Sequence, residues 1–246
     1  MNKMMNKKVL FGLTTTPGSD WKGKIEEIRK FNLEEIALFP TFLEIKERKE
    51  LYALLENTGL ERIPHIHLRD DTEFWELEYY TKRFQTEVFN IHAVPQALKL
   101  LQFDQYKDKI FVENQEQLDD LYWKALGNSG GFCLDFSHWY DFDQTQHNPQ
   151  YEKLNEMLDK NVYKIGCCHI SAVRETQKEW THYLTGKIVI NYSYHQYNSL
   201  NEFDYIKKYV RYFPHYVSIE LEDSFERQFA VKKYLEKLIE ESTEDK

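Results

Sequence analysis

The chain has 246 residues, of which 41% are hydrophobic and 15% aromatic, and its formal net charge is −9. This composition predicts a folded protein with a sizeable core and excludes a disordered or low-complexity chain. The acidic balance disfavours a general surface for nucleic acid or anionic membranes, because such surfaces need clustered Lys and Arg.

The three cysteines, Cys133, Cys167 and Cys168, cannot all pair, and they lack the spacing of a zinc finger. We expect them to be small buried side chains in a reducing compartment. The basic N-terminus is followed by an apolar run of only residues 9–13, which is too short for a secretory signal or a membrane span. The sequence therefore predicts a cytoplasmic protein without a membrane segment.

Strand patterns alternate with helical patterns along the chain. The predicted strands are 9–14, 35–39, 63–68, 88–92, 109–113, 131–136, 164–169 and 215–220. The spacing of apolar residues predicts helices over 21–31, 44–57, 72–84, 95–101, 115–126, 150–158, 200–210 and 224–239. The longest connection, 170–199, contains one extended segment at 187–190.

Eight strand and helix units in a chain of this length predict a closed (β/α)8 TIM barrel, an α/β fold in a single domain over 1–246, with 1–8 as a flexible N-terminus. An open, doubly wound sheet is the alternative. No Gly-x-Gly-x-x-Gly follows the first strand and no P-loop is present, so nucleotide binding by these motifs has no support.

Polar side chains that can bind a metal end six consecutive predicted strands: His67, His92, Glu113, Asp135, His169 and Glu220. The ends of barrel strands form the active-site face. Burying several carboxylates together is costly unless a cation or protons compensate, so we expect a divalent metal such as Mn, Mg, Co or Zn. The two-residue pleat places Phe111, Cys133, Cys167 and Ser218 beneath Glu113, Asp135, His169 and Glu220.

The order of Glu113, Asp135-Phe-Ser-His138, His169 and Glu220 after strands five to eight resembles the xylose-isomerase-like TIM-barrel superfamily. This group includes ketose 3-epimerases, hydroxypyruvate isomerases, inosose dehydratases and the endonuclease IV proteins. Segment 181–188 is similar to the family's His-x-x-x-Gly loop, with Ile188 in place of the usual second glycine. The resemblance implies that Glu113, Asp135, His169 and Glu220 bind one divalent metal.

The isomerase and epimerase branch implies that Glu113 and Glu220 also act as catalytic acid and base on a metal-chelated substrate. The expected reaction is isomerisation or epimerisation of a sugar or hydroxy-keto acid. The expected partner is a small sugar-like hydroxy ketone rather than a nucleic acid, and the oligomeric state stays open. The candidates for substrate binding are His138, Arg174, His67, His92 and His182.

The endonuclease branch is the alternative, because its extra histidines resemble His67 and His92. That branch also has an Asp-x-His pair after strand seven, whereas this chain has Trp180-Thr-His182. The departure disfavours a three-metal site that cleaves DNA and leaves one or two metals acting on a smaller phosphodiester. A barrel that binds metal without catalysis is the third alternative.

Several histidines keep two interpretations. His67 and His92 either bind a ligand or hydrogen-bond to neighbouring carboxylates. His138 should contact substrate if there is one metal and should be a ligand if there are several. His65, just after Pro64, is expected to be structural. Trp139, Tyr140 and Trp180 stand where a pocket wall is expected.

Overall fold

The computed structural model describes residues 7–181 and 188–244. The parallel strands are β1 (Lys8–Leu10), β2 (Gly12–Thr14), β3 (Glu35–Phe39), β4 (Arg62–His67), β5 (Val88–Ile91), β6 (Ile110–Glu113), β7 (Phe132–Asp135), β8 (Ile165–Ile170) and β11 (Tyr216–Ile219). Strands β9 (Ala172–Thr181) and β10 (Ile188–Tyr194) form a separate antiparallel pair.

The helices surround this sheet. The α-helices are α1 (Trp21–Phe31), α2 (Ile45–Glu56), α3 (Phe74–Phe84), α4 (Asp120–Leu126), α5 (Phe136–Trp139), α6 (Gln150–Asp159) and α7 (Phe225–Glu244). The 3-10 helices are η1 (Ala97–Gln102), η2 (Lys107–Lys109), η4 (Leu200–Lys208) and η5 (Val210–Tyr212), and η3 (Tyr140–Thr145) is a π-helical turn.

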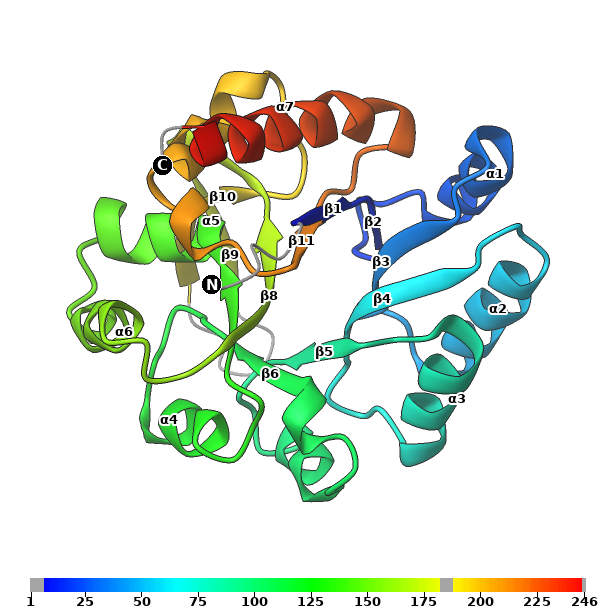
Figure 1. Cartoon of the computed structure of the whole chain (residues 1–246), viewed down its shortest axis with the longest axis horizontal. Helices are drawn as coiled ribbons and strands as arrows, with labels where there is room; N and C mark the ends of the chain where they lie inside the picture. The colour runs from blue at the N-terminus through cyan, green and yellow to red at the C-terminus, as the bar shows by residue number, and fades with distance from the viewer. Residues whose placement is uncertain (1–6, 182–187, 245–246) are drawn as a thin grey trace.

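The parallel strands form a nearly closed barrel in one α/β domain (Figure 1), with the order β1-β11-β8-β7-β6-β5-β4-β3-β2. Since β1 and β2 are consecutive pieces of the first strand, that strand pairs with β11 on one side and β3 on the other. The TIM-barrel prediction is therefore confirmed. The C-terminal strand ends meet at one face, which is where the polar strand ends were expected to gather.

Side chains stabilise the break between β1, which pairs with β11, and β2, which pairs with β3. Gly12 lies so close to β11 that an added Cβ would be 1.7 Å from the carbonyl oxygen of Ile219. The Gln228 carboxamide accepts from Gly12 N at 2.8 Å and donates to Gly12 O at 3.0 Å. The buried Lys24 ammonium donates to Leu221 O at 2.7 Å and to Thr14 Oγ1 at 3.2 Å. These bonds satisfy backbone groups that lack a strand partner at this break.

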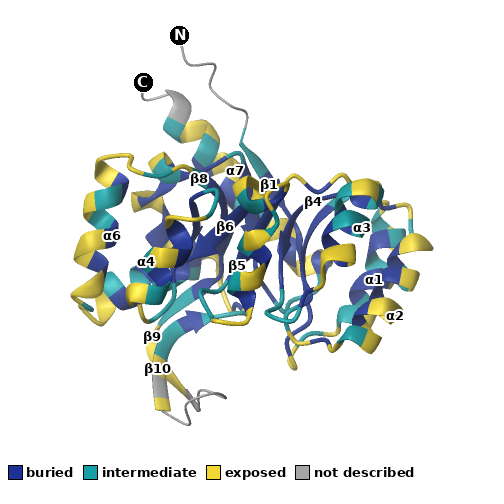
Figure 2. Ribbon diagram, turned by 90° about the horizontal axis from the view of Figure 1, so that it is seen from below, coloured by how far each residue is buried: buried dark blue, intermediate teal, exposed yellow. Residues whose placement is uncertain are grey.

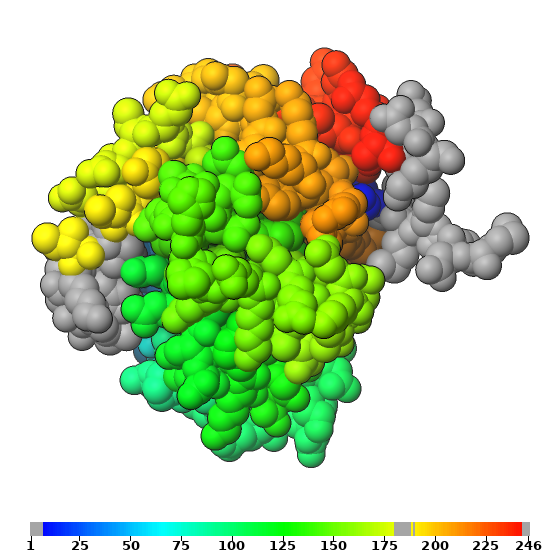
Figure 3. Space-filling model, turned by 90° about the vertical axis from the view of Figure 1, so that its left-hand side faces the viewer, coloured from blue at the N-terminus to red at the C-terminus, as the bar shows by residue number. Residues whose placement is uncertain are grey.

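The core has two layers. Inside the barrel pack Leu10, Ala37, Phe39, Val88, Phe111, Cys133, Cys167 and Tyr216. A larger apolar layer joins the strands to the helices outside, so the strands in Figure 2 are buried and the outer helix faces are exposed. Figure 3 shows α4 to α6 (green to yellow-green) and residues 200–212 (orange) packed together on one face. As expected, the three cysteines are buried, and they are free of disulfides.

Several element predictions need correction. The helix predicted over 115–126 begins at Asp120, because the carboxylate of Asp119 accepts from Tyr122 N at 3.0 Å and caps the helix there. The helices predicted at 95–101 and 200–210 are 3-10 turns. The hairpin of β9 and β10 replaces most of the connection predicted at 170–199, and it extends from one end of the barrel in Figure 2. Residues 175–179 of β9 are exposed, so no buried apolar alternation reveals this strand in the sequence.

The predicted flexible terminus over 1–8 falls mainly on residues 1–6, which lie outside the described residues. Lys8 already belongs to β1 and pairs with Tyr216. Within residues 7–181 and 188–244, no helix combines the length and the apolar character needed to cross a membrane.

Candidate metal centre

The Glu113 carboxylate, at the end of β6, is the centre of a buried polar cluster at the barrel mouth. Its oxygens lie close to four imidazole nitrogens: His67 Nε2 at 2.9 Å, His169 Nδ1 at 3.4 Å, His92 Nε2 at 3.4 Å and His138 Nδ1 at 3.9 Å. The structure thus brings together residues from the ends of β4, β5, β6, β7 and β8.

One group of possible metal ligands is Glu113, Asp135 and His169, whose ligand atoms lie within 4.8 Å of one another. Glu220 Oε2 lies 3.3 Å from His169 Nδ1 and adds a further carboxylate. Asp135 Oδ2 and His169 Nδ1 are buried and make no hydrogen bond. Buried polar atoms are ordinarily paired, so these two orphaned atoms fit a cation held between them.

A second group of possible ligands is His67, His92 and Glu113, also within 4.8 Å of one another. His67 is buried, with Nδ1 3.1 Å from Leu68 O and Nε2 2.9 Å from Glu113 Oε2. Burial lowers the pKa of His67 despite the nearby Glu113 charge, so the neutral ring has one proton for two oxygen neighbours. A cation at Nε2 would resolve this, because the proton could then stay on Nδ1.

The charges of the cluster favour added positive charge. Burial alone would raise the pKa of Glu113, but His169, His92 and His67 hold it well below its usual value. His169 likewise outweighs burial and lowers the pKa of Glu220 to about 2. In return, Glu113 and Glu220 overcome the burial of His169 and raise its pKa to about 10. The carboxylates are therefore ionised and attract a cation or a proton to the same place.

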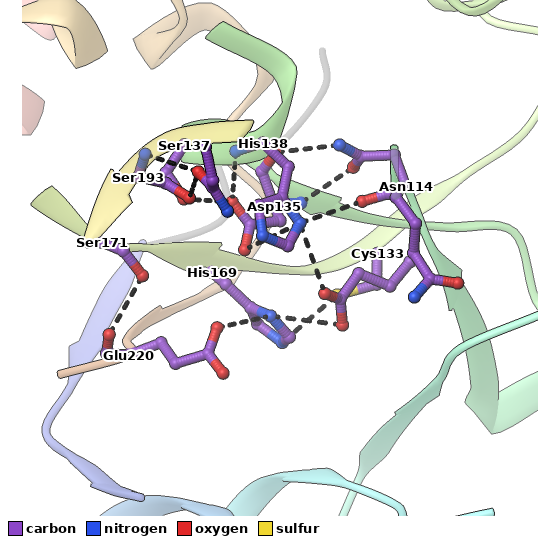
Figure 4. A network of polar contacts seen from close by, with 12 residues as sticks. Asn114, Cys133, Asp135, Ser137, His138, His169, Ser171, Ser193 and Glu220 are labelled. Carbon is purple, nitrogen blue, oxygen red and sulfur yellow. Dashed lines mark hydrogen bonds and ion pairs between the residues drawn. The ribbon is translucent and has the colours of Figure 1, made fainter. Parts of the chain in front are cut away.

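Asp135 is oriented by its neighbours on both sides. Its Oδ1 accepts from Ser137 Oγ at 2.6 Å and from His138 N at 2.8 Å, where it caps α5. Its backbone N–H and carbonyl bond to the Asn114 carboxamide, each at 2.9 Å (Figure 4). With Oδ1 occupied by donors, Oδ2 is left to face the cluster and lies 3.6 Å from His138 Nδ1.

His138 lies at the edge of the cluster, with 21% of its side chain exposed. Its Nδ1 is 3.3 Å from the carbonyl oxygen of Asn114. Burial lowers the pKa of His138, but the charges of Asp135 and Glu113 outweigh it and raise the pKa. His92 is 39% exposed, whereas His169 is fully buried. Solvent therefore reaches the cluster from the side of His138 and His92.

The remaining residues predicted to bind substrate are Arg174 and His182. Arg174, on β9, donates from Nε to Glu202 at 3.1 Å and from Nη2 to Gln196 O at 2.6 Å. These bonds hold its guanidinium at the base of the hairpin, and its role in substrate binding stays a prediction. His182 lies outside the described residues.

Of the three aromatic residues predicted to form a pocket wall, only Tyr140 is seen to line a hollow in the described part of the structure. Trp139 is buried and donates to Asn155 Oδ1 at 2.8 Å, so it packs beneath the surface. Tyr140 lines a hollow of about 360 Å³ at the base of the hairpin, together with Arg174. The side chain of Trp180 lies outside the described part of the structure.

His65 is fully buried and bonded through both nitrogens, as expected for a structural residue. Two contributors were not anticipated from the sequence: Asn90, which donates to Glu113 Oε2 at 2.7 Å, and Asn114. The signal for Asn90 was its place on β5 two residues before His92, a spacing that points both side chains to the same side of an extended chain.

No protein-family model matches the chain, and no curated protein resembles it significantly. The structure itself shows a TIM-like barrel with buried His, Glu, Asp and Cys groups at which a metal ion would fit, an arrangement consistent with an enzyme. The likeness to one superfamily remains a prediction from the strand ends.

Proposed function

We propose that this protein is a hydrolase of small phosphoesters that uses two divalent cations. The observation that carries the proposal is that Glu113 belongs to two of the three groups of possible ligands found among the described residues, so one carboxylate stands between two cation positions. Two-metal sites of this kind recur in phosphatases and nucleases.

One cation would be held by Glu113, Asp135, His169 and Glu220, and the other by His67, His92 and Glu113. These oxygen and imidazole donors suit Zn²⁺, Mn²⁺ or Co²⁺. When bound, such cations polarise a phosphoryl oxygen and lower the pKa of a bound water.

The contacts of Glu113 favour hydrolysis over proton transfer at carbon. Its Oε2 accepts from Asn90 at 2.7 Å and faces His67 at 2.9 Å, while its Oε1 faces His92 and His138. Glu113 therefore has no uncommitted oxygen with which to take a proton from a substrate carbon. The partly exposed His138, whose pKa is raised, can instead hold a proton and give it to a leaving oxygen.

A metal-dependent isomerase or epimerase of sugars or hydroxy-keto acids is the second candidate. It is favoured by one observation: Glu113 and Glu220 lie at 3.4 Å and 3.3 Å from the same nitrogen of His169. Two carboxylates beside one cation position could act as base and acid on a chelated ketose. In this reaction a single cation is sufficient.

The test uses the Zn²⁺- or Mn²⁺-loaded protein with bis(p-nitrophenyl) phosphate and p-nitrophenyl phosphate, and follows release of p-nitrophenolate. We expect hydrolysis that falls strongly in both Asp135→Asn and His67→Gln. Glu78→Gln is the control, because Glu78 lies on the outer helix α3 and pairs with Lys82, and we expect it to keep the wild-type rate.

A parallel assay measures deuterium exchange from solvent into candidate ketoses. Exchange without phosphoester hydrolysis would refute the hydrolase and support the isomerase. Full activity of His67→Gln alongside an inactive Asp135→Asn would refute the two-cation site. Cleavage of an abasic-site oligonucleotide, with no hydrolysis of the small esters, would refute the small-molecule substrate class.

A further inference from the structure

The carboxamide of Asn90, fully buried in β5, joins three members of the barrel interior. Its Nδ2 donates to Glu113 Oε2 at 2.7 Å. Its Oδ1 lies 2.9 Å from His65 Nε2 and 3.3 Å from His169 Nε2. Asn90 therefore contacts one carboxylate that both cation positions share and one imidazole that belongs to the first of them.

The contact with Glu113 determines which way this carboxamide points. The amide Nδ2 donates to Glu113 Oε2 at 2.7 Å, and a carboxylate that binds a cation can only accept hydrogen bonds. The Asn90 amide N–H must therefore face Glu113, because the reverse orientation would set two oxygen atoms 2.7 Å apart. The Asn90 oxygen then faces both imidazoles.

This orientation fixes the protons of two histidines. An amide oxygen only accepts, so His65 and His169 each carry a proton on Nε2. For His169, the Sγ of Cys133 also lies 3.4 Å from this nitrogen, on the same side of the ring. The opposite nitrogen, Nδ1, faces Glu113 and Glu220 without a hydrogen bond. It is the nitrogen whose lone pair a cation would use.

A contact on the other ring nitrogen of His65 orients the imidazole that bonds to Asn90. His65 Nδ1 lies 2.7 Å from Ser218 Oγ, and both side chains are fully buried. Ser218 is on β11 and His65 on β4, so the chain of bonds from Ser218 through His65 and Asn90 to Glu113 crosses the barrel interior. Each member has few other conformations in a packed interior, because leaving a buried polar atom unpaired is costly.

We infer that Asn90 is a positioning residue for the metal centre: with His65 and Ser218 it keeps a proton on Nε2 of His169, so that a cation binds at Nδ1 by displacing the proton there, and it aims Glu113 between the two cation positions. The inference rests on the metal centre of the proposed function, but not on the reaction. Partners of this kind typically change metal affinity by about 10-fold to 100-fold.

The test measures Zn²⁺ affinity of the chelator-treated full chain by isothermal titration calorimetry. We expect Asn90→Leu to weaken binding by about 10-fold to 100-fold, and Ser218→Ala, a milder change, to weaken it less. Thr86→Val is the matched control: Thr86 is a buried side chain just before the same strand, and its hydroxyl donates to the backbone at Ile63 O and Tyr80 O instead of to a side chain of the cluster.

A second readout separates positioning from general damage to the fold. Nitrogen NMR of the zinc-loaded, [15N]His-labelled protein distinguishes a protonated from a metal-bound ring nitrogen, and His169→Gln identifies the signal among the nine histidines. We expect the proton of His169 on Nε2 in wild type and in the control Thr86→Val, which keeps the Asn90 carboxamide. Asn90→Leu should show mixed signals.

Wild-type affinity in both Asn90→Leu and Ser218→Ala would overturn the inference, as would equal losses in Asn90→Leu and Thr86→Val. A proton on Nδ1 of His169 in the loaded wild type would also overturn it. If wild type binds no metal, both the inference and the proposed function fail. If it binds metal but hydrolyses no phosphoester, only the proposed function fails.

Discussion

Replacing Glu113 by Gln should remove both cations, whereas replacing a ligand of one group should remove one. Glu113 stands in both groups of possible ligands, Asp135 in the first and His67 in the second. Asp135→Asn and His67→Gln should therefore each keep one cation, and Glu113→Gln should keep none. Glu113 is the residue that these two groups share.

The gain in stability that each cation gives follows from mass action. A ligand that binds only the folded state at about 100 times its dissociation constant adds about 2.7 kcal/mol of stability. For a chain of this size, 1 kcal/mol shifts the melting temperature by about 2–4 °C, so each cation should add about 5–11 °C. Wild type should gain two such increments, Asp135→Asn and His67→Gln one each, and Glu113→Gln none.

The assay is differential scanning calorimetry with and without Zn²⁺, with elemental analysis of the dialysed protein for the metal count. Glu78→Gln is the control, because Glu78 is an exposed carboxylate on α3 that pairs with Lys82. It should keep both increments. One retained cation in Glu113→Gln would refute the shared carboxylate, and two in His67→Gln would refute the second position.

Two further predictions concern buried charges. Burial lowers the pKa of Lys24 to about 7, so above pH 7 the unfolded chain binds a proton that the folded protein lacks, and stability rises with pH up to the ordinary lysine range. From pH 7 to pH 9, wild type should gain about 2 kcal/mol over Lys24→Met in urea unfolding, and equal slopes would contradict this. Glu76, fully buried, bonds to Arg48 Nε at 2.8 Å, so Glu76→Gln should cost about 3–5 kcal/mol. The exposed Glu78→Gln on the same helix should cost less than about 1 kcal/mol, and a similar cost for both would refute the role of burial.

The sequence by itself determined the barrel and most of its polar mouth. Apolar strands and helices alternate with local periods, and the parallel order of strands then brings their carboxyl ends to one face. For this reason the sequence alone places Glu113, Asp135, His169 and Glu220 together. Their spacing along the chain carried the information.

Only the tertiary structure decided how the side chains share that face. It brought His67 and His92 onto the same carboxylate as His169, turned Arg174 toward Glu202, and set Asn90 between Glu113 and two imidazoles. It also paired β9 with β10. Residues 175–179 of β9 are exposed, so they lack the alternation of apolar and polar residues by which a half-buried strand is recognised in a sequence. Side-chain direction, proton placement and shared ligands depend on distances between strands far apart in the sequence, and the local period of a single strand does not contain them.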